Sequence, residues 1–340
     1  MTRFAQLPPE EREVYFRELV LQRGVSPVIA EKDFWVCWTL GRVFALADLA
    51  PELVFKGGTS LSKVFGAIDR FSEDIDLSVS PALLGWREVD LDEAPSSSMR
   101  EKLMKKLESD CIRTVEQRLQ PALEAAVRDI LGAPKGTAWI SFQIDPVSNS
   151  PVLLFHYPTN AGVAAGYIQP VVKIELGSLT DQRPTGTHPI SPMVAEIARA
   201  EFDDFSEQVV ALDLERTFWE KATILHAEYH RPQQLPIRDR FARHYADFMA
   251  LWRHPHGQRA RQDLALLARV VTHKSRFFRS SWSNYDTARP GTLRLAPPRS
   301  HEADLRADLQ KMRPMFLTQG PDFDELLAVM REAEDTINAA

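Results

Sequence analysis

Two aspartates separated by one residue, Asp74 and Asp76, are the side chains of this sequence best suited to chemistry. They alternate with Ile75 and Leu77, a pattern that predicts a strand with one buried face. Side chains two residues apart on a strand point to the same face, so the two carboxylates project together. Such carboxylates repel each other unless a cation lies between them, and Mg²⁺ is the usual cation for oxygen ligands beside phosphates. We therefore expect Mg²⁺, or Mn²⁺, at this pair.

A glycine turn lies just upstream of the two aspartates. A short apolar segment, typical of a strand, leads into Gly57, Gly58, Thr59 and Ser60. Glycines allow backbone N–H groups to approach a polyphosphate closely, and the two hydroxyls stand beside them. The turn and the acidic pair together predict metal-dependent nucleotidyl transfer, in which NMP moves from an NTP to a hydroxyl and pyrophosphate leaves.

A third acid is expected, because two-metal sites of this kind need about three carboxylates. The segment 171–176 supplies a candidate, since Lys173 and Glu175 share one face of a predicted strand while apolar residues share the other. We expect Glu175 to complete the metal ligands, with Lys173 beside it. The alternative is an exposed strand face that carries an ordinary Lys–Glu pair.

Cations must also bind the phosphates or the ribose of the NTP, and the candidates are Lys63, Arg70, Lys173 and Lys221. Lys221 shares a face with Thr217 on an amphipathic helix. Asp247 lies on a predicted helical stripe with Arg240 and with Arg243 or His244. The alternative for each is a surface ion pair, which contributes little to stability.

Composition restricts the class of protein. The chain has 340 residues, of which 44% are hydrophobic, and a net charge of −6. No stretch approaches the roughly 20 apolar residues that span a bilayer, and the N-terminus has no apolar signal core, so we expect a cytoplasmic protein without a membrane partner. Two cysteines, Cys37 and Cys111, build neither a disulfide framework nor a zinc site. The negative charge argues weakly against a nucleic-acid coat, although residues 238–244 and 253–279 are locally basic.

The order of predicted elements indicates an α+β fold. Strands are expected at 52–56, 74–80, 139–144, 152–157, 168–176 and 209–212, with helices at 8–48, 59–68 and 99–131, the last interrupted near Pro121, and a loop at 177–192. From residue 213 onward the pattern is helical. We therefore expect a nucleotidyltransferase-like mixed sheet flanked by helices in an N-terminal domain, 1–212, and a helical C-terminal domain, 213–340, that completes the cleft for NTP and acceptor.

The segments 56–63 and 70–77 resemble the first motif of the AbiEii/AbiGii nucleotidyltransferase toxins, members of the polymerase-beta-like nucleotidyltransferase superfamily. The resemblance extends over most of residues 28–300. The segment 31–36 is similar to the helix before the first motif, and the second, third and fourth motifs are matched by 172–175, 215–221 and 240–247.

This resemblance implies a toxin of a type IV toxin–antitoxin or abortive-infection system for phage defence, with an AbiEi-like antitoxin encoded nearby. Some members add nucleotides to the 3′ end of tRNA and so stop translation. It further implies that Asp74 and Asp76 are metal ligands and that Lys173, Lys221 and Asp247 are needed for activity. The nucleotide-binding residues on this interpretation are Gly57, Gly58, Thr59, Ser60, Lys63, Arg70, Ser72 and Lys221.

Two other functions remain open on the sequence. The same site could transfer a nucleotide to a protein or small-molecule hydroxyl, because loops that choose the acceptor are poorly read from sequence. A non-catalytic nucleotide-binding or partner-binding module could keep the fold, although such a module has no need of paired acids.

Overall fold

The computed structural model of the chain describes residues 1–87, 90–91, 93–159 and 170–340. The chain forms two compact units. Unit 1 comprises Met1–Val64 and Glu73–Ala211, and unit 2 comprises Phe65–Ser72 and Leu212–Ala340. The two units alternate along the chain because the short segment 65–72 belongs to unit 2. The single domain boundary after residue 212 stays a prediction.

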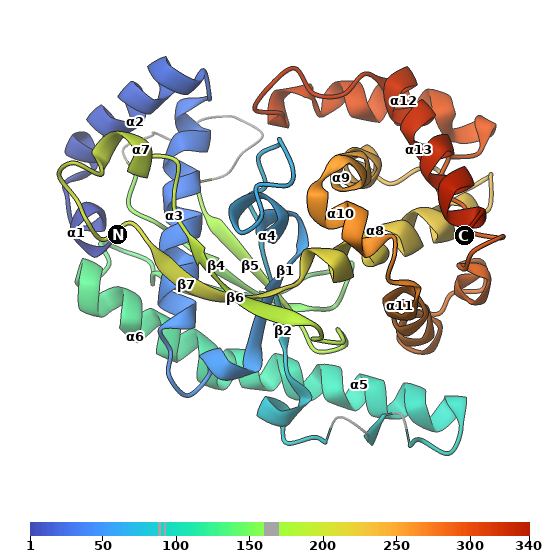
Figure 1. Cartoon of the computed structure of the whole chain (residues 1–340). Helices are drawn as coiled ribbons and strands as arrows, with labels where there is room; N and C mark the ends of the chain where they lie inside the picture. Colours follow the sequence, from blue (N-terminus) through green and yellow to red (C-terminus); the bar gives the residue numbers. More distant parts are fainter. Residues whose placement is uncertain (88–89, 92, 160–169) are drawn as a thin grey trace. The chain divides into compact units, whose positions relative to one another are not determined.

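Unit 1 contains a seven-stranded mixed sheet in the order β3-β4-β5-β2-β1-β7-β6 (Figure 1). The strands are β1 (Leu53–Lys56), β2 (Ile75–Val79), β3 (Ile140–Ile144), β4 (Pro151–Phe155), β5 (Val172–Gly177), β6 (Thr185–Ile190) and β7 (Glu207–Leu212). β2 lies between β1, to which it is antiparallel, and β5, to which it is parallel. The mixed sheet flanked by helices that the sequence predicts is therefore confirmed.

One strand was missed. β6 lies inside the segment 177–192 that the sequence predicts as a loop. Its residues include Gly186 and Pro189, which weaken any strand signal. β6 is the last strand in the sheet order of the described residues, and at such an edge position a residue without an N–H is tolerated. β5 begins at Val172, later than expected, and positions 168 and 169 of the predicted strand lie outside the described residues.

Helix α3 (Pro27–Phe44) of unit 1 is largely buried. It begins with Ser26 as the N-cap, whose side chain accepts a hydrogen bond from the Ile29 N–H, and with a proline in its first turn. Trp35 stacks on Tyr157 with ring centroids 5.6 Å apart, and Trp38 stacks on Phe155 at 5.4 Å. These aromatic contacts fix α3 against the end of β4.

The other helices of unit 1 are α1 (Thr2–Ala5), α2 (Pro9–Arg23), α4 (Gly57–Lys63), α5 (Ser97–Thr114), α6 (Gln120–Leu131) and α7 (Ala195–Ala198). Between α5 and α6 the chain forms a π-helical turn, Val115–Leu119. Pro121 lacks an N–H and its ring crowds the carbonyl four residues earlier, which explains the widened turn at the interruption expected there.

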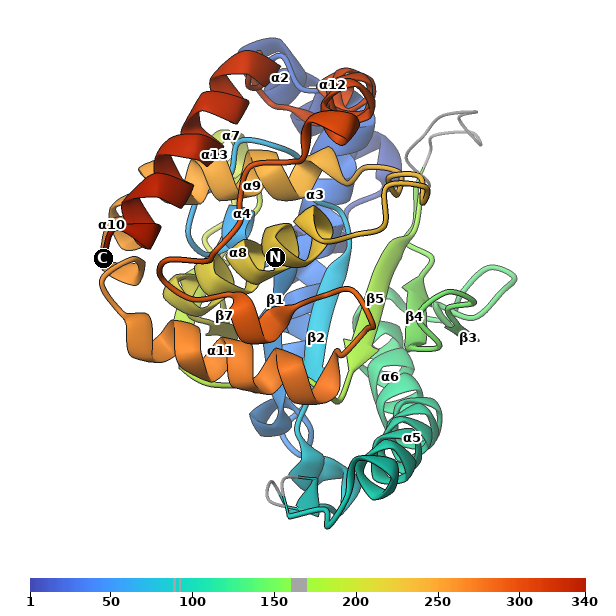
Figure 2. The ribbon, with the colours of Figure 1, turned by 90° about the vertical axis from the view of Figure 1, so that its right-hand side faces the viewer.

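Unit 2 is helical, as predicted. Its helices are α8 (Leu214–Tyr229), α9 (Ala242–Arg253), α10 (Pro255–Ala260), α11 (Leu264–Phe277), α12 (Glu302–Lys311) and α13 (Phe323–Asn338). α8 and α9 lie side by side (Figure 2) and pack through Phe218 and Phe248, whose ring centroids are 5.0 Å apart. Among the described residues, no helix combines the length and apolarity that crossing a bilayer requires.

Candidate active site

The predicted acids meet on adjacent strands of the sheet. Asp76 on β2 and Glu175 on β5 are register partners. Paired residues of neighbouring strands project to the same face, about 4.8 Å apart along the hydrogen-bonding direction. Asp74 precedes β2 by one residue, and the intervening Ile75 is buried on the opposite face. The structure thus brings together the three carboxylates that the sequence selects.

The electrostatics of this face are unfavourable for a carboxylate without a cation. Burial, followed by the charges of Glu73, Asp76 and Glu175, raises the pKa of Asp74 to about 6. The ammonium of Lys173 opposes this shift without cancelling it. The face therefore carries negative charge that a bound cation would relieve.

Gly57 makes room for the carboxylate of Asp76. Its φ is +82°, a left-handed backbone conformation that glycine adopts without strain. A Cβ at this position would also collide with the Oδ2 of Asp76. Glycine is therefore required here both by backbone conformation and by the position of an acidic side chain.

The hydroxyls of the glycine turn are directed into the protein. Thr59 and Ser60 are fully buried in α4. The Thr59 hydroxyl donates to the backbone carbonyl of Asp74, and the Ser60 hydroxyl donates to the carbonyl of Gly57 at 3.1 Å. The Thr59 hydroxyl thus fastens α4 to the residue before β2, whereas the Ser60 hydroxyl bonds within α4. Their predicted contact with a triphosphate stays a prediction.

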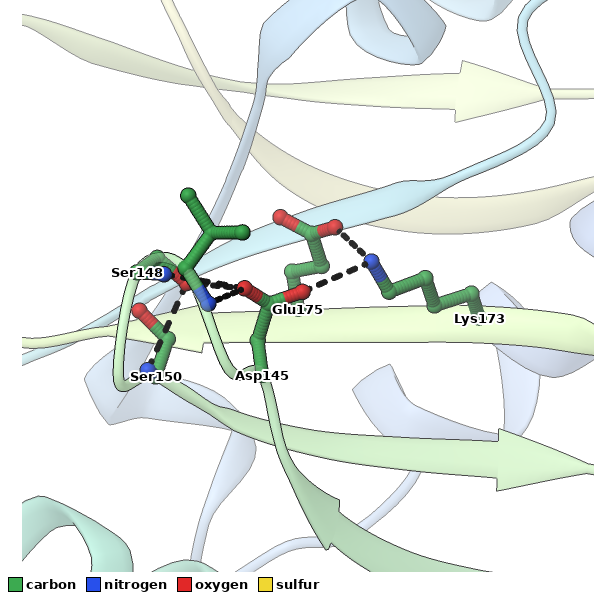
Figure 3. A network of polar contacts seen from close by, with 6 residues as sticks. Asp145, Ser148, Ser150, Lys173 and Glu175 are labelled. Atoms are coloured by element: carbon green, nitrogen blue, oxygen red, sulfur yellow. Dashed lines mark hydrogen bonds and ion pairs between the residues drawn. The ribbon is translucent and has the colours of Figure 1, made fainter.

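Lys173 lies between two acids (Figure 3). Its Nζ donates to Glu175 Oε1 and lies 3.5 Å from Asp145 Oδ2. Burial alone would lower the pKa of Lys173, but its hydrogen bond to Glu175 and the nearby acids raise it above its ordinary value. Lys173 is therefore a fixed cation beside the acidic face.

Asp145 is a site residue that the sequence analysis missed. It follows β3 and accepts hydrogen bonds from the backbone N–H groups of Val147 and Ser148, at 3.0 and 2.9 Å (Figure 3). These bonds lower its pKa to about 2, so it remains ionised beside Lys173. In the sequence it is an aspartate followed by proline between two strands, a pattern that indicates a turn and carries no sign of a site.

The acidic face suits a divalent cation in donor chemistry but is not arranged as a preformed metal site. Asp74, Asp76 and Glu175 all offer carboxylate oxygens, which are the donor atoms that Mg²⁺ and Mn²⁺ prefer. Across the described residues, however, no three His, Cys, Asp or Glu side chains are gathered in a metal-binding arrangement. Glu175 is directed to Lys173, so binding by all three acids would require that pair to rearrange.

A second charged cluster lies in unit 2. Arg70 donates from Nε and Nη2 to the two carboxylate oxygens of Asp247, at 2.7 and 2.9 Å. Lys221 donates to Oδ2 of the same carboxylate at 2.6 Å. Asp247 is 1% exposed. Burial alone would raise the pKa of Asp247, but the two cations and their hydrogen bonds lower it well below its ordinary value.

His244, which the sequence offers as an alternative to Arg243 on the Asp247 stripe, also lies in this cluster. Its Nδ1 lies 3.3 Å from Lys221 Nζ. Burial and the Lys221 charge lower the pKa of His244 well below its ordinary value, so the ring is neutral and accepts from the ammonium. Burial also lowers the pKa of Lys221, although Asp247 opposes this. Two cations thus share one carboxylate, and the cluster carries a net positive charge.

The remaining predicted residues are spread over both units. Gly58 lies in the first turn of α4, and Ser72 is half-buried at the end of the unit 2 segment 65–72. Lys63, at the end of α4, forms a buried ion pair with Asp33 of α3. The predicted roles of these residues in nucleotide binding stay predictions.

The loop between α11 and α12 is pinned by a neutral histidine. His226 Nδ1 accepts from the Arg294 N–H at 3.0 Å, so Nε2 carries the proton and donates to the Asn284 carbonyl, also at 3.0 Å. Burial lowers the pKa of His226 to about 4. Trp282 is half-buried, and the guanidinium of Arg231 lies over its ring, 5.6 Å from the ring centroid.

The family model described as "Nucleotidyl transferase AbiEii toxin, Type IV TA system" matches residues 38–329. This chain belongs to the AbiEii family. The match spans the sheet of unit 1 and most helices of unit 2, and it includes every acid and cation discussed above except Asp33. Membership makes the protein a nucleotidyltransferase and a toxin of a type IV toxin–antitoxin system, as the sequence resemblance predicts.

Other comparisons add little to this assignment. No curated protein matches the chain. Among solved structures, the chain is similar to MenT4, a nucleotidyltransferase toxin from Mycobacterium tuberculosis H37Rv, with 16% sequence identity and a TM-score of 0.44. The alignment covers 96% of this chain and 98% of that one.

Proposed function

We propose that this AbiEii-family protein transfers NMP from an NTP to an RNA acceptor, the 3′ end of tRNA, with a divalent metal, Mg²⁺ or Mn²⁺, bound by Asp74, Asp76 and Glu175. The observation that supports it is the shared face of β2 and β5, where Asp76 and Glu175 are register partners. The raised pKa of Asp74 supports a cation there, because the ionised form is disfavoured without one.

Each acid has a distinct task in this proposal. When bound, the metal would neutralise phosphate charge and activate the attacking hydroxyl. Asp74, just before β2, and Asp76, within it, would hold the metal, and Gly57 leaves the space that the Asp76 carboxylate occupies. Glu175 would bind the metal in place of its present partner Lys173. Asp145 retains Lys173, which keeps an ammonium beside the phosphates.

The cluster of unit 2 supplies a further cation. Both carboxylate oxygens of Asp247 are already bound by Arg70 and Lys221. We therefore assign Asp247 to orienting Lys221 and assign Lys221 to binding the NTP, since two cations against one carboxylate leave positive charge for a phosphate. Gly57, Gly58, Thr59 and Ser60 shape the turn that receives the triphosphate.

The biological setting follows from the family. A type IV toxin implies an antitoxin partner, and we propose an AbiEi-like protein encoded nearby, with abortive infection as the outcome. Transfer to a protein or small-molecule hydroxyl is the second candidate, favoured by the overall negative charge of the chain. A non-catalytic module is the third, and the acids on β2 and β5 argue against it.

The test is incubation of the protein with each α-labelled NTP, Mg²⁺ and total tRNA, followed by gel separation. Label on the tRNA 3′ end is expected with the wild type and not with Asp76→Asn. Glu196→Gln, which changes an exposed acid of unit 1 in the same way, serves as the matched control and keeps activity. Label on protein with none on RNA would instead support the second candidate.

A growth experiment tests the toxin setting. Expression of the wild type should slow bacterial growth, and Asp76→Asn should relieve it. Co-expression of the neighbouring gene product should restore growth without changing the amount of toxin. Equal growth inhibition by Asp76→Asn would show that the toxicity has another source.

A further inference from the structure

The helix α3 carries two consecutive charged residues that the proposed chemistry leaves unused, Lys32 and Asp33. They are 3% and 1% exposed, which is unusual for ionised side chains. Both form ion pairs within unit 1. Charged groups this deeply buried are costly to fold unless each has a well-placed partner, so their partners indicate what the two residues hold in place.

Asp33 holds the end of α4. One carboxylate oxygen forms the ion pair with Lys63, the last residue of that helix, and the other accepts from the Met193 N–H at 2.7 Å. Burial alone would lower the pKa of Lys63, but the charge of Asp33 raises it above its ordinary value. The Lys63 ammonium is therefore committed to α3.

Lys32 holds the chain where it enters β2. Its Nζ lies 2.7 Å from Oε2 of Glu73, and the two side chains are 4% and 12% exposed. Glu73 immediately precedes Asp74. Since α3 is fixed to the sheet by Trp35 and Trp38, this ion pair restricts the backbone from which the Asp74 carboxylate projects.

A third interaction links α4 directly to the residue before β2. The Thr59 hydroxyl of α4 donates to the backbone carbonyl of Asp74. Asp33 thus links α3 to α4, and Thr59 links α4 to the chain just before β2. Lys32 in turn links that part of the chain, through Glu73, to α3. All three ties are buried or half-buried.

We propose that Lys32 and Asp33 are positioning residues that fix Asp74 relative to the glycine turn, and that Lys63 belongs to this framework and does not bind the triphosphate. The proposal rests on the proposed metal-dependent transfer and deepens it. The sequence predicts that Lys63 binds the nucleotide. In this proposal Lys63 instead helps to set the geometry of the acidic face.

The variants Asp33→Asn and Lys63→Met distinguish phosphate binding by Lys63 from positioning by the Asp33–Lys63 pair, because the two roles predict different changes in rate and in NTP affinity. If Lys63 positions, both variants lower the transfer rate by a similar factor, about tenfold or more, because a small misplacement of a reacting group is costly. Affinity for an α,β-methylene NTP, measured by calorimetry, then stays within about twofold, and the double variant is no worse than either single one.

The opposite pattern would overturn the proposal. If Lys63 binds phosphate, Lys63→Met weakens NTP affinity, whereas Asp33→Asn releases the ammonium and leaves the affinity equal or tighter. Arg42→Met is the matched control, because Arg42 lies on the same helix in a more exposed pair with Glu207. Its rate should remain within about twofold of the wild type. Rates are expressed per folded protein, from the unfolding transition of each variant.

Two further measurements complete the test. If Lys32 merely neutralises Glu73, Lys32→Met combined with Glu73→Gln restores the rate; positioning predicts that it does not. Affinity for Mn²⁺ alone, measured by calorimetry, should fall in Asp33→Asn and Lys63→Met alike. This readout needs no acceptor, so a wild type that binds Mn²⁺ but transfers no label would contradict the proposed function and still decide the positioning roles. Unchanged Mn²⁺ affinity in both variants contradicts the positioning roles.

Discussion

The two charged clusters of this protein balance their charge in opposite ways. In unit 1, Asp74, Asp76 and Glu175 gather on one sheet face, and the pKa of Asp74 is raised to about 6. In unit 2, a single carboxylate, Asp247, is bound by two cations, and its pKa is lowered well below the ordinary value. The first cluster carries an excess of negative charge, which Lys173 only partly offsets, and the second carries an excess of positive charge.

This difference indicates which cluster lowers the free energy of unfolding and which raises it. Acids that repel one another reduce stability and are tolerated where a ligand restores the balance. A carboxylate with buried partners on both oxygens instead stabilises its surroundings, and its removal leaves cations buried without a counter-charge. The same Asp→Asn change should therefore act in opposite directions on the stability of the two units.

The largest expected effect is on catalysis at the acidic face. Asp76→Asn should lower the rate of label transfer by on the order of 10³-fold or more, because metal-assisted charge stabilisation is lost. The fold should remain intact, since the substitution keeps the side chain's shape beside Gly57. Transfer assays and circular dichroism check both expectations. A variant that retains a tenth of the wild-type rate would remove Asp76 from the metal ligands.

Asp247→Asn should have the largest effect on stability. We expect the free energy of unfolding to fall by about 3–5 kcal/mol, because Arg70 and Lys221 then lose the buried carboxylate that both bind. Denaturant titration measures the change. Glu325→Gln is the matched control in unit 2, since it breaks an exposed pair with Arg253 and should cost about 0–1 kcal/mol. Equal effects of the two substitutions would show that the buried cluster is not a stabilising unit.

Asp74→Asn should change stability in the other direction. At pH 7.5 without metal it should stabilise by on the order of 1–3 kcal/mol, because the ionised carboxylate is disfavoured in the fold. A raised folded pKa means that the contribution of Asp74 to stability is fully present below its unfolded value, near 4, and is lost as pH rises through about 6. The advantage of the variant over the wild type should therefore vanish below about pH 4.

Denaturant melts of the wild type and Asp74→Asn between pH 4 and 8 check this sign. A variant that is less stable than the wild type at pH 7.5 would mean that Asp74 already has a compensating partner in the folded protein.

The smallest effect is that of the metal itself on stability. Mn²⁺ at ten times its dissociation constant should stabilise the wild type by about 1.4 kcal/mol through mass action. Removal of the metal with a chelator should reverse the shift, and Asp76→Asn should show little of it. Thermal unfolding with and without Mn²⁺ is the measurement. An equal shift in both proteins would locate the bound ion away from the acidic face.

The sequence analysis was most successful where local patterns are strong. Alternation of apolar and charged residues placed Asp74, Asp76 and Glu175 on strands with a common face, and the helices of unit 2 were identified by their period. β6 was missed because glycine and proline hide a strand that is stabilised only by its neighbour in the sheet. Asp145 was missed because its importance depends on Lys173, which follows 28 residues later.

The partners of the basic residues could not be predicted from the sequence, because a motif lysine has the same sequence context whether it faces solvent or a buried acid. Lys63 and Arg70 were both expected at the NTP, and the structure gives them the carboxylates of Asp33 and Asp247. Their partners lie 30 and 177 positions away, beyond the reach of any periodicity.

By itself, the sequence determined the fold class, the family and the acids of the proposed site, since these depend on short-range alternation and on a local motif. The tertiary structure alone decided which cations are committed to which carboxylates, because ion pairing depends on distance and burial and not on separation along the chain. The packing that buries Lys32, Asp33 and Asp247 also brings each of them within ion-pair distance of its partner.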